Sequence, residues 1–476
     1  MIEELGKLQR ELKDLKIPVM IAFEGYGAAG KGYQISKLLE ALDPRGFVVY
    51  PVKKETKDEE MHPFLWRFWT KMPQKGRIAI YDSSWYRRVL IDYFDGDVKE
   101  SQLAEAFHSI TVFEKELTDD GMHLIKIFLD IDQKEQKKRF TKLLASKNSA
   151  WRVTKDDLKR NEHFEKYQAM NEKMLAKTSS VNAPWYKIDA KKKKEATQEI
   201  YRVIIAELTK AIYLKKEKQT EEANQEVTGT KEASFIENRL GQVDLDKSYT
   251  KEEYKEKLKF LEKRIEDLHG ELYRKRIPLV IGFEGWDAGG KGGAIKRLTK
   301  KMDPRGYQVH PTASPNEVER QYHYLWRFWR DVPKFGHVSI FDRTWYGRVL
   351  VERIEGFATE NEWKRAYGEI CEMEKDWVNQ GYIVLKFWLQ IDKEEQRRRF
   401  EARLNNPLKQ WKITEEDWRN REKWEQYERA VNEMIVKTSL PDAPWIIVEG
   451  NDKYYARIKV LETVIAAIEK RLQKEK

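Results

Sequence analysis

The sequence predicts an α/β fold of two tandem domains, each a parallel β-sheet flanked by helices. Short apolar runs alternate with segments of helical spacing, and strands that alternate with helices are typical of a parallel sheet covered on both faces. The whole order of motifs then occurs a second time along the chain. A repeat of that length indicates a duplicated domain rather than a solenoid of short units.

The two copies keep a constant spacing. Gly25 and Gly285 lie 260 residues apart, as do Asp82 and Asp342. The other matched motifs are LDPRG at Leu42 and MDPRG at Met302, LWRFW at Leu65 and Leu325, and APW at Ala183 and Ala443. A constant offset means that no net insertion separates these anchors, so the copies should share one topology.

Domain boundaries follow from a change in composition between the copies. The segment 214–250 is polar and poor in aromatic residues, with KKEKQTEEANQEVTGTKEAS at its centre, and is expected to be a linker. The first domain should then span residues 1–213 and the second residues 251–476.

The second copy shows the expected elements most clearly. IPLVIGF at 277–283 is an apolar strand that leads into a glycine-rich loop and the helical segment GAIKRLTKKM at 293–302. HVSIFD at 337–342 and YIVLKFWLQI at 382–391 are two further buried strands, and the charged helix KEEQRRRFEARL follows at 393–404.

Composition limits the class of protein. Of the 476 residues, 40% are apolar and 12% aromatic, so the chain is globular despite its 36% charged residues. The excess of 90 Lys and Arg over 80 Asp and Glu gives a net charge of +10, which indicates either an anionic partner or a solvated basic surface. The first 18 residues have amphipathic helical spacing unlike a secretory signal or membrane span, and the single Cys371 cannot form an internal disulfide. A cytoplasmic protein without membrane association is expected.

The stretch FEGWDAGGKGG, 283–293, has the glycine spacing of a phosphate-binding loop between a strand and a helix. Backbone N–H groups at the start of such a helix bind phosphate oxygens, and Lys291 can reach a transferring phosphoryl group. A tight structural turn is the alternative explanation. The glycines predicted to bind phosphate are Gly285, Gly289, Gly290 and Gly292.

Gly292 stands where such loops usually carry a Ser or Thr that binds magnesium. Asp287, inside the loop, and Asp342, at the end of the neighbouring strand, are the predicted metal ligands, because magnesium is commonly held by carboxylates, phosphates and waters. The alternative role for Asp287 is to close the loop by bonding its backbone. Arg343 and Arg348 follow Asp342 directly, so cations, carboxylates and glycines should meet at one sheet edge.

These motifs resemble those of the polyphosphate kinase 2 family. The resemblance rests on FEGWDAGGKGG, MDPRGY, YLWRFWRDVPKFGHVSIFDRTWYGRVLVERIEG and WKITEEDWRNREKWEQYERAVNEMIVKTSLPDAPW, which occur in this order. It implies P-loop kinase-like domains similar to thymidylate kinase, each with a helical lid, that transfer phosphate between inorganic polyphosphate and nucleotides. Fused two-domain members resemble the branch that phosphorylates AMP to ADP. The implied activity is a polyphosphate:AMP phosphotransferase with Mg²⁺, or Mn²⁺ as the alternative ion, in an assembly of subunits.

The resemblance also implies roles for individual residues. Asp287 and Asp342 become metal ligands and general-base candidates, and Lys291 and Arg343 would contact the transferring phosphates. Arg348 would lie close by, and Arg403 falls where the family places a phosphate-binding arginine.

The segment ITEEDWRNREKWEQYERA, 413–430, is the candidate lid helix, with Thr414 as its cap. On it, Arg419 and Arg421 could close over the phosphates, and a purely packing helix is the alternative. Among the remaining candidates, Arg397 and Arg398 are interpreted as solvated, and Trp326, Trp329 and Trp345 as core residues.

The first copy lacks part of this set. Asp287 corresponds to Gly27, Arg343 to Ser83 and Arg403 to Leu143, and the matched residues Lys31, Asp82 and Arg88 are retained. Arg87 replaces Gly347, and could return a guanidinium one helical turn after Ser83. The first copy is therefore predicted to be a poor catalyst that kept its fold as a docking or polyphosphate-binding module.

Other functions stay open at this point. They are a polyphosphate-dependent kinase of ADP or another nucleotide, an ATP-using nucleoside monophosphate kinase, and a non-enzymatic protein that binds nucleic acid. Asp287 and Asp342 disfavour the last, because carboxylates repel phosphate unless a metal intervenes. The expected partners are inorganic polyphosphate, AMP and ADP, without nucleic acid.

Overall fold

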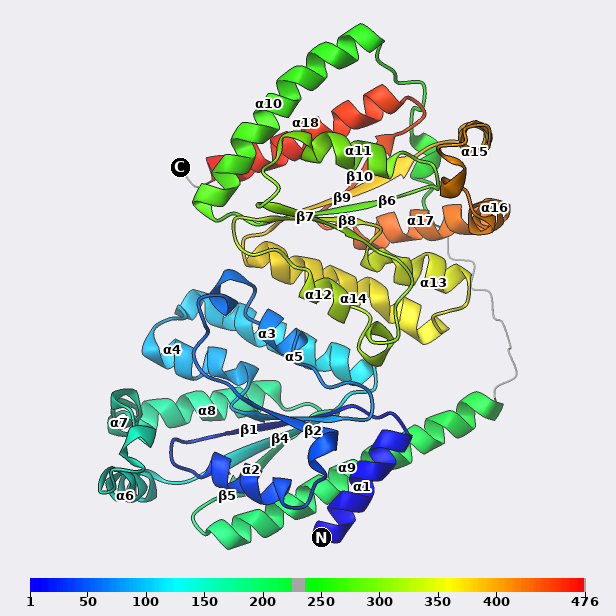
Figure 1. Cartoon of the computed structure of the whole chain (residues 1–476). Helices are drawn as coiled ribbons and strands as arrows, with labels where there is room; N and C mark the ends of the chain where they lie inside the picture. Colours follow the sequence, from blue (N-terminus) through cyan, green and yellow to red (C-terminus); the bar gives the residue numbers. More distant parts are fainter. Residues whose placement is uncertain (225–235, 475–476) are drawn as a thin grey trace. The chain divides into compact units, whose positions relative to one another are not determined.

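The computed structural model of the chain describes residues 1–224 and 236–474 and divides into two compact units, each built mainly from one copy. Each unit contains a five-stranded sheet whose strands pair in parallel. The strand order is β2-β3-β1-β4-β5 in the first unit and β7-β8-β6-β9-β10 in the second. These orders are equivalent under the duplication, so the predicted α/β fold of two tandem domains is confirmed (Figure 1).

The first unit begins with the amphipathic helix expected at the N-terminus. Its strands are β1 (Val19–Gly25), β2 (Phe47–Pro51), β3 (Ile78–Asp82), β4 (His123–Asp130) and β5 (Trp185–Asp189). Its helices are α1 (Ile2–Asp14), α2 (Lys31–Leu39), α3 (Trp66–Trp69), α4 (Ile91–Asp95), α5 (Glu100–Asp119), α6 (Gln133–Leu144), α7 (Lys155–Glu162), α8 (Phe164–Thr178) and α9 (Lys193–Asn224). Helices α1, α2 and α9 cover one face of the sheet, and α5 and α8 cover the other (Figure 1).

The second unit repeats this arrangement. Its strands are β6 (Leu279–Gly285), β7 (Tyr307–Pro311), β8 (Val338–Asp342), β9 (Ile383–Gln390) and β10 (Trp445–Glu449). Its helices are α10 (Lys251–Lys275), α11 (Lys291–Leu298), α12 (Trp326–Arg330), α13 (Val351–Ile354), α14 (Glu360–Asn379), α15 (Lys393–Leu404), α16 (Glu415–Glu422), α17 (Trp424–Thr438) and α18 (Lys453–Gln473). Here α10, α11 and α18 lie on one face, and α14 and α17 on the other (Figure 1).

The central strand β6 sets the position of the candidate site. It pairs with β8 on one side and β9 on the other. Leu279, Ile281 and Phe283 are fully buried in one hydrophobic core, because alternate side chains of a strand point to the same face. Because the three strands are parallel, their carboxyl ends reach the same edge of the sheet, where α/β proteins bind ligands.

Described parts of the segment 214–250 belong to the two units. Helix α9 continues past residue 213, and residues 225–235 lie outside the described residues. After that gap the chain packs on the second unit, where the Leu240 N–H donates to Asn432 Oδ1 at 3.0 Å. An exposed helix can have the same polar composition as a linker, and the expected bounds 214–250 stay a prediction. Helix α10 begins at Lys251.

The candidate lid segment is two helices rather than the single helix expected. The break falls at Lys423, whose Nζ forms an ion pair with Glu355 at 2.8 Å. Helix α16 follows the predicted cap Thr414 and has no fully buried residue, whereas α17 buries a stripe that includes Val431 and Met434. The packing interpretation therefore holds for α17.

The tryptophans singled out from the sequence are core residues. Trp326, Trp329 and Trp345 are 7%, 2% and 1% exposed, which confirms their predicted burial. Among the described helices, none combines the length and the apolar character that crossing a membrane requires.

Candidate active site

The phosphate-binding loop joins β6 to α11. Gly285 has a φ of 148°, and a side chain there would bring its Cβ to 2.7 Å from the carbonyl oxygen of Leu389. A Cβ at Gly289 would lie 2.8 Å from the carbonyl oxygen of Trp286. Only glycine fits these two positions without a backbone shift. Gly290 precedes α11 in a left-handed conformation, and the N–H groups at the start of the helix suit a phosphate.

A cavity of about 520 Å³ opens over this loop. It brings together most of the residues predicted to handle phosphate and metal: Asp287, Gly289, Gly290, Lys291, Gly292, Asp342, Arg343 and Arg403. A second cavity of about 370 Å³ shares Asp287, Lys291 and Arg343 with the first, and adds Gly285 and Arg419. Cations and carboxylates thus share one edge of the sheet, as the sequence indicated.

Lys291 and Arg343 are held by different partners, a backbone carbonyl for Lys291 and a carboxylate for Arg343. The Lys291 Nζ donates to the Gly285 carbonyl at 2.6 Å, so the ammonium lies over the loop. The Arg343 guanidinium contacts Asp287 Oδ1 at 3.2 Å and is half exposed. Arg343 also has a φ of 65°, and its N–H donates to the Phe283 carbonyl at 3.0 Å. The pairing of Phe283 with Asp342 holds the end of β8 beside the loop, and the Asp287 contact holds the guanidinium there.

The two carboxylates fit a divalent cation that also binds substrate. Asp287 and Asp342 line the same cavity, and Asp287 Oδ2 accepts from Asn420 Nδ2 at 3.0 Å. The described residues contain no group of three or more His, Cys, Asp or Glu placed to hold a metal by themselves. An ion here would complete its shell with phosphates and waters, as magnesium commonly does. In the described part of the chain, a Cβ at Gly292 would meet no atom within 4 Å, so none of the described side chains takes the place of the missing hydroxyl at that point.

Two predicted site residues lie elsewhere. Arg348 forms an ion pair with Glu352 at 3.2 Å and is absent from the lining of the cavities described above. Arg421 donates to the Lys393 carbonyl and to Gln396 Oε1 at 3.3 Å, so its guanidinium lies against α15. Of the two lid arginines, Arg419 lines the second of these two cavities, and Arg421 lines neither of them.

Several residues that support the loop were missed from the sequence. Arg399 is 4% exposed and donates to the carbonyls of Ala288 at 2.9 Å and Gly289 at 3.0 Å. These two hydrogen bonds hold the backbone of the loop against α15. Gln396 donates to the Asp287 carbonyl at 3.2 Å. Both residue types are retained at the matched positions of the first copy, and this retention was the sequence feature that could have pointed to them. Asn420 is not retained in the first copy, so no such feature pointed to it.

A buried acid ties the loop to the turn after β8. Glu284 accepts from the Thr344 N–H at 2.7 Å and from its hydroxyl at 2.8 Å. Burial raises the pKa of Glu284, although the nearby Lys291 ammonium and the hydrogen bonds from Thr344 act to lower it. A Cβ at Gly282 would lie 2.9 Å from Thr344 Cγ2, so the turn packs against the strand at this point.

A second buried network fixes the far side of that turn. Glu374 is fully buried and accepts from Trp345 Nε1 at 2.9 Å, Tyr346 Oη at 2.8 Å and Lys386 Nζ at 2.6 Å. Lys386 also donates to the Thr438 carbonyl at 2.6 Å. The first copy has the same network.

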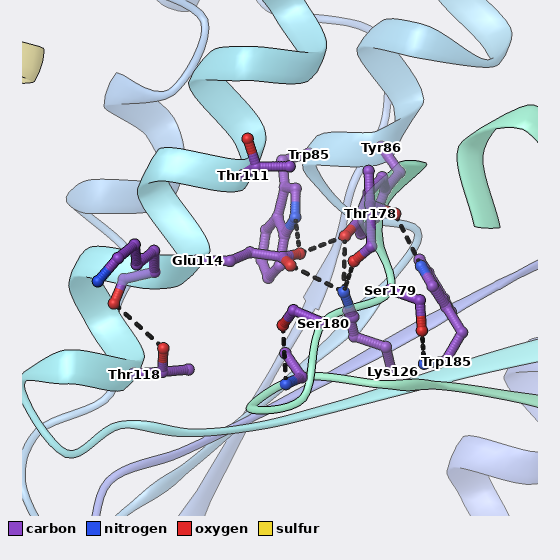
Figure 2. A network of polar contacts seen from close by, with 12 residues as sticks. Trp85, Tyr86, Thr111, Glu114, Thr118, Lys126, Thr178, Ser179, Ser180 and Trp185 are labelled. Atoms are coloured by element: carbon purple, nitrogen blue, oxygen red, sulfur yellow. Dashed lines mark hydrogen bonds and ion pairs between the residues drawn. The ribbon is translucent and has the colours of Figure 1, made fainter. Parts of the chain in front are cut away.

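Figure 2 shows that first-copy network, in which Lys126 and Glu114 meet beneath Trp85 and Tyr86. The Lys126 Nζ to Glu114 Oε2 distance is 2.8 Å, and both side chains are buried. The network is therefore a property of the fold, present with or without a complete site above it.

The first copy lacks three of the polar side chains of the second site, because Gly27, Ser83 and Leu143 stand in place of Asp287, Arg343 and Arg403. Gly27 itself supplies no carboxylate to the loop. A Cβ at Gly27 would lie 3.2 Å from Asp157 Oδ1 and 3.3 Å from Phe140. Lys31 still donates to the Gly25 carbonyl at 3.2 Å. The other retained or replaced positions are Asp82 at the end of β3, Ser83 with a φ of 61°, Arg88 over the Phe64 ring, and Leu143 on α6.

Arg87 does not compensate for Ser83 in the expected way. It lies in a 3-10 turn, Trp85–Val89, rather than an α-helix, and its Nε pairs with Asp92 at 3.0 Å. The equivalent acid in the second copy, Glu352, pairs with Arg348. Arg87 is thus engaged by an acid on α4.

A parallel sheet with a glycine-rich loop and a cavity of cations and carboxylates at its edge is the arrangement expected of a protein that binds phosphate groups. The model for the family "Polyphosphate kinase 2 (PPK2)" matches residues 1–218 and 248–476, and the chain belongs to this family.

Curated relatives match the whole chain. The polyphosphate:AMP phosphotransferase of Pseudomonas aeruginosa is 40% identical over 100% of this chain and 95% of that protein. The enzyme of the same name from Acinetobacter johnsonii is 34% identical over 94% of this chain and 90% of that protein. A crystal structure described as a polyphosphate kinase 2 from Pseudomonas aeruginosa superposes with a TM-score of 0.87 at 39% identity, covering 100% of this chain and 95% of that one.

Proposed function

We propose that this protein transfers a phosphoryl group from inorganic polyphosphate to AMP, giving ADP, and that the second copy performs the reaction. The observation that supports this most is the 520 Å³ cavity, where Lys291, Arg343 and Arg403 surround the phosphate-binding loop beside two carboxylates. Full-length relatives that carry the name polyphosphate:AMP phosphotransferase support the choice of donor and acceptor.

The side chains suit a reaction that needs charge and position rather than a covalent nucleophile. Lys291 and Arg343 would hold the transferring phosphoryl group, and Arg403 would hold the next part of the donor. Asp287 orients Arg343 through their ion pair at 3.2 Å. Preorganised cations of this kind stabilise the charge that develops in the transition state.

Asp287 and Asp342 would hold Mg²⁺, with Mn²⁺ as the alternative ion. When bound, the ion would neutralise charge on the phosphates. The first copy has no carboxylate at Gly27, which supports its role as a poor catalyst that docks or binds polyphosphate. Cytoplasmic location, a homo-oligomeric assembly and the absence of nucleic acid as a partner remain predictions.

The acceptor would occupy the 370 Å³ cavity. Its lining combines Arg343 and Arg419, which suit a phosphate, with Leu350, Val351 and Phe357, which suit a nucleoside. It adjoins the loop cavity through Asp287 and Lys291, so an acceptor phosphate there would face the donor.

One assay separates the functions left open by the sequence. The protein is mixed with Mg²⁺ and either AMP or ADP, with polyphosphate or ATP as donor, and products are followed by chromatography. ADP formed from AMP and polyphosphate supports the proposal. ADP formed only with ATP indicates a conventional monophosphate kinase, ATP formed only from ADP indicates a different acceptor, and no transfer in any mixture indicates a binding protein.

A further inference from the structure

Asn420 makes a hydrogen bond from the lid helix α16 to the phosphate-binding loop. Its Nδ2 donates to Asp287 Oδ2 at 3.0 Å, whereas the other oxygen of that carboxylate, Oδ1, contacts the Arg343 guanidinium at 3.2 Å. The Asp287 side chain is 15% exposed, so protein groups rather than bulk water surround most of it. The proposed transfer reaction assigns no role to Asn420.

The amide of Asn420 has a defined orientation. An ionised carboxylate can only accept hydrogen bonds, so the NH₂ group of Asn420 must face Asp287. The carbonyl oxygen of the amide, Oδ1, then accepts from the Tyr427 hydroxyl at 3.3 Å. Tyr427 is 9% exposed on α17, the packed helix of the lid segment. A chain of contacts therefore leads from α17 through Asn420 to the loop.

Helix α16 is held in place by a small number of side-chain contacts. Each of its residues is exposed or half-buried. Trp418 lies edge-on against Phe400 of α15, with the ring centroids 5.1 Å apart, and Arg421 donates to the Lys393 carbonyl of the same helix. These contacts join α16 to α15, whereas the Asn420 contact joins it to a carboxylate of the loop.

The first copy changes both partners of this hydrogen bond together. Gly27 stands in place of Asp287, and Arg160 on α7 stands in place of Asn420. Arg160 instead pairs with two acids, each at 3.1 Å: Asp95 and Asp157. The copy without a loop carboxylate thus also lacks the lid amide.

A neighbouring contact of the same loop is kept in both copies. Gln396 donates to the Asp287 carbonyl at 3.2 Å, and Gln136 donates to the Gly27 carbonyl at 3.1 Å. The hydrogen bond that supports the loop backbone therefore does not depend on the residue type at this position. Asn420 is present together with the carboxylate, which indicates that it serves the carboxylate rather than the shape of the loop.

We infer that Asn420 is a positioning residue for Asp287, which it holds from the lid so that both carboxylate oxygens stay available to a metal ion. The inference rests on the proposed function, because it takes Asp287 as a metal ligand of the transfer reaction. An ionised carboxylate has about four lone-pair sites, two on each oxygen. Arg343 and Asn420 use one site on each oxygen, which leaves one on each for a cation or its waters.

A neutral amide suits this position better than a cation. A guanidinium would also hold the carboxylate, but it would add a second positive charge beside Asp287, next to that of Arg343, and compete with a divalent ion. An alanine would leave Oδ2 without its lid partner. Loss of a group that orients a metal ligand typically costs about 10- to 100-fold in metal affinity or activity.

The Mg²⁺ dependence of ADP formation by the full chain tests this role. With polyphosphate and AMP saturating, Asn420→Ala should raise the Mg²⁺ concentration at half-maximal rate about tenfold, and kcat at saturating Mg²⁺ should stay within about threefold of wild type. Asn420→Arg, which introduces the residue of the first copy, should raise that concentration further. Arg160→Ala is the matched control, and it should leave the Mg²⁺ dependence unchanged because Gly27 offers no carboxylate.

Hydrogen exchange of the metal-free protein without substrates provides a readout that does not depend on activity. Asn420→Ala should speed amide exchange in α16 about fivefold or more, as expected for the loss of one charge-assisted hydrogen bond, and leave α17 unchanged. Asp287→Ala should act in the same way, and the double variant should add little, because both changes remove one contact. Asn420→Arg should keep α16 protected, since the arginine would pair with Asp287. This variant thus separates lid anchoring from metal binding.

Several results would overturn the inference. One is an unchanged Mg²⁺ dependence of Asn420→Ala, with or without a lower kcat, because Asn420 would then be at most a packing residue of the lid. Others are a wild-type Mg²⁺ dependence of Asn420→Arg and an equal shift from Arg160→Ala. Thermal melting identifies a variant that fails to fold, and the other substitution of Asn420 then decides. A wild-type protein that transfers phosphate only from ATP would instead overturn the proposed donor, and the same Mg²⁺ series with ATP would decide the role of Asn420.

Discussion

Replacing Glu374 by Gln tests whether the buried network beneath the second site holds the catalytic turn. Gln has nearly the same shape, but it removes the negative charge that lies 2.6 Å from the Lys386 ammonium, where both side chains are at most 1% exposed. Breaking a buried ion pair by removing one partner typically destabilises a protein by about 3–5 kcal/mol. Glu114→Gln breaks the same arrangement in the first copy and should cost a similar amount.

The two variants should differ in catalysis. Glu374 binds Trp345 and Tyr346, which follow Asp342 and Arg343 on the same short turn. A misplacement of about 1 Å at a reacting group costs about 10²-fold in rate, so Glu374→Gln should lower kcat by about that factor. Glu114→Gln acts on a turn without a complete site and should keep kcat within about threefold of wild type.

Both quantities are measured on the full chain. Urea unfolding followed by circular dichroism gives the loss of stability, and ADP formation from AMP and polyphosphate gives kcat at a temperature where both variants are folded. If Glu114→Gln lowers kcat as much as Glu374→Gln, the network acts through overall stability, or the first copy contributes to catalysis. If Glu374→Gln loses stability but keeps kcat, the network does not position the turn.

Three further predictions address the metal, the donor and a structural acid. Asp287→Asn should lower activity strongly at ordinary Mg²⁺ and raise the Mg²⁺ concentration needed, with little change in the urea midpoint; normal turnover at ordinary Mg²⁺ would favour the loop-closing role. The apparent affinity for long polyphosphate should fall more steeply with salt than that for AMP, and equal losses for the two substrates in a salt series of KM values would contradict donor binding by several Lys and Arg side chains. The His123 hydrogen bond lowers the pKa of Glu207 to about 2, against the effect of burial, and Tyr186 assists. The lowered pKa of Glu207 contributes stability that is present above the ordinary Glu pKa and is lost as pH falls from there through about 2. Glu207→Gln should therefore lose less unfolding free energy than wild type between pH 6 and pH 3, as measured by urea titrations.

The fold could be predicted because it rests on local patterns that occur twice. The strand ending at Asp342 and the charged helix 393–404 coincide with β8 and α15, since a buried run and a capped polar helix leave clear boundaries. The break at Lys423 could not be predicted, because the helical pattern continues through it and a tertiary ion pair with Glu355 accompanies the break. Tertiary contacts of this kind leave no signal in neighbouring residues.

The site was predicted where chemistry and backbone geometry fall on the same short motif. Gly289, Gly290, Gly292, Lys291 and the Asp342–Arg343 pair meet this condition, and they line one cavity. Arg348 and Arg421 were assigned from proximity along the chain, which does not fix side-chain direction: one pairs with Glu352 and the other with α15. Asn420 was missed because its partner, Asp287, lies far away in the sequence.

The division of labour between the copies is the central claim, and a pair of matched lysine variants tests it most directly. Lys291→Ala should lower kcat by about 10²-fold or more, as expected when one preorganised charge-stabilising group is removed. Lys31→Ala should leave kcat within about a factor of three, because the first copy has Gly27 in place of a metal ligand, and its effect should fall on the apparent KM for polyphosphate. Melting temperatures of both variants should match, so that the rates report chemistry. A similar loss of kcat, about twofold, from each variant would show that the copies are equal catalysts and would contradict the account.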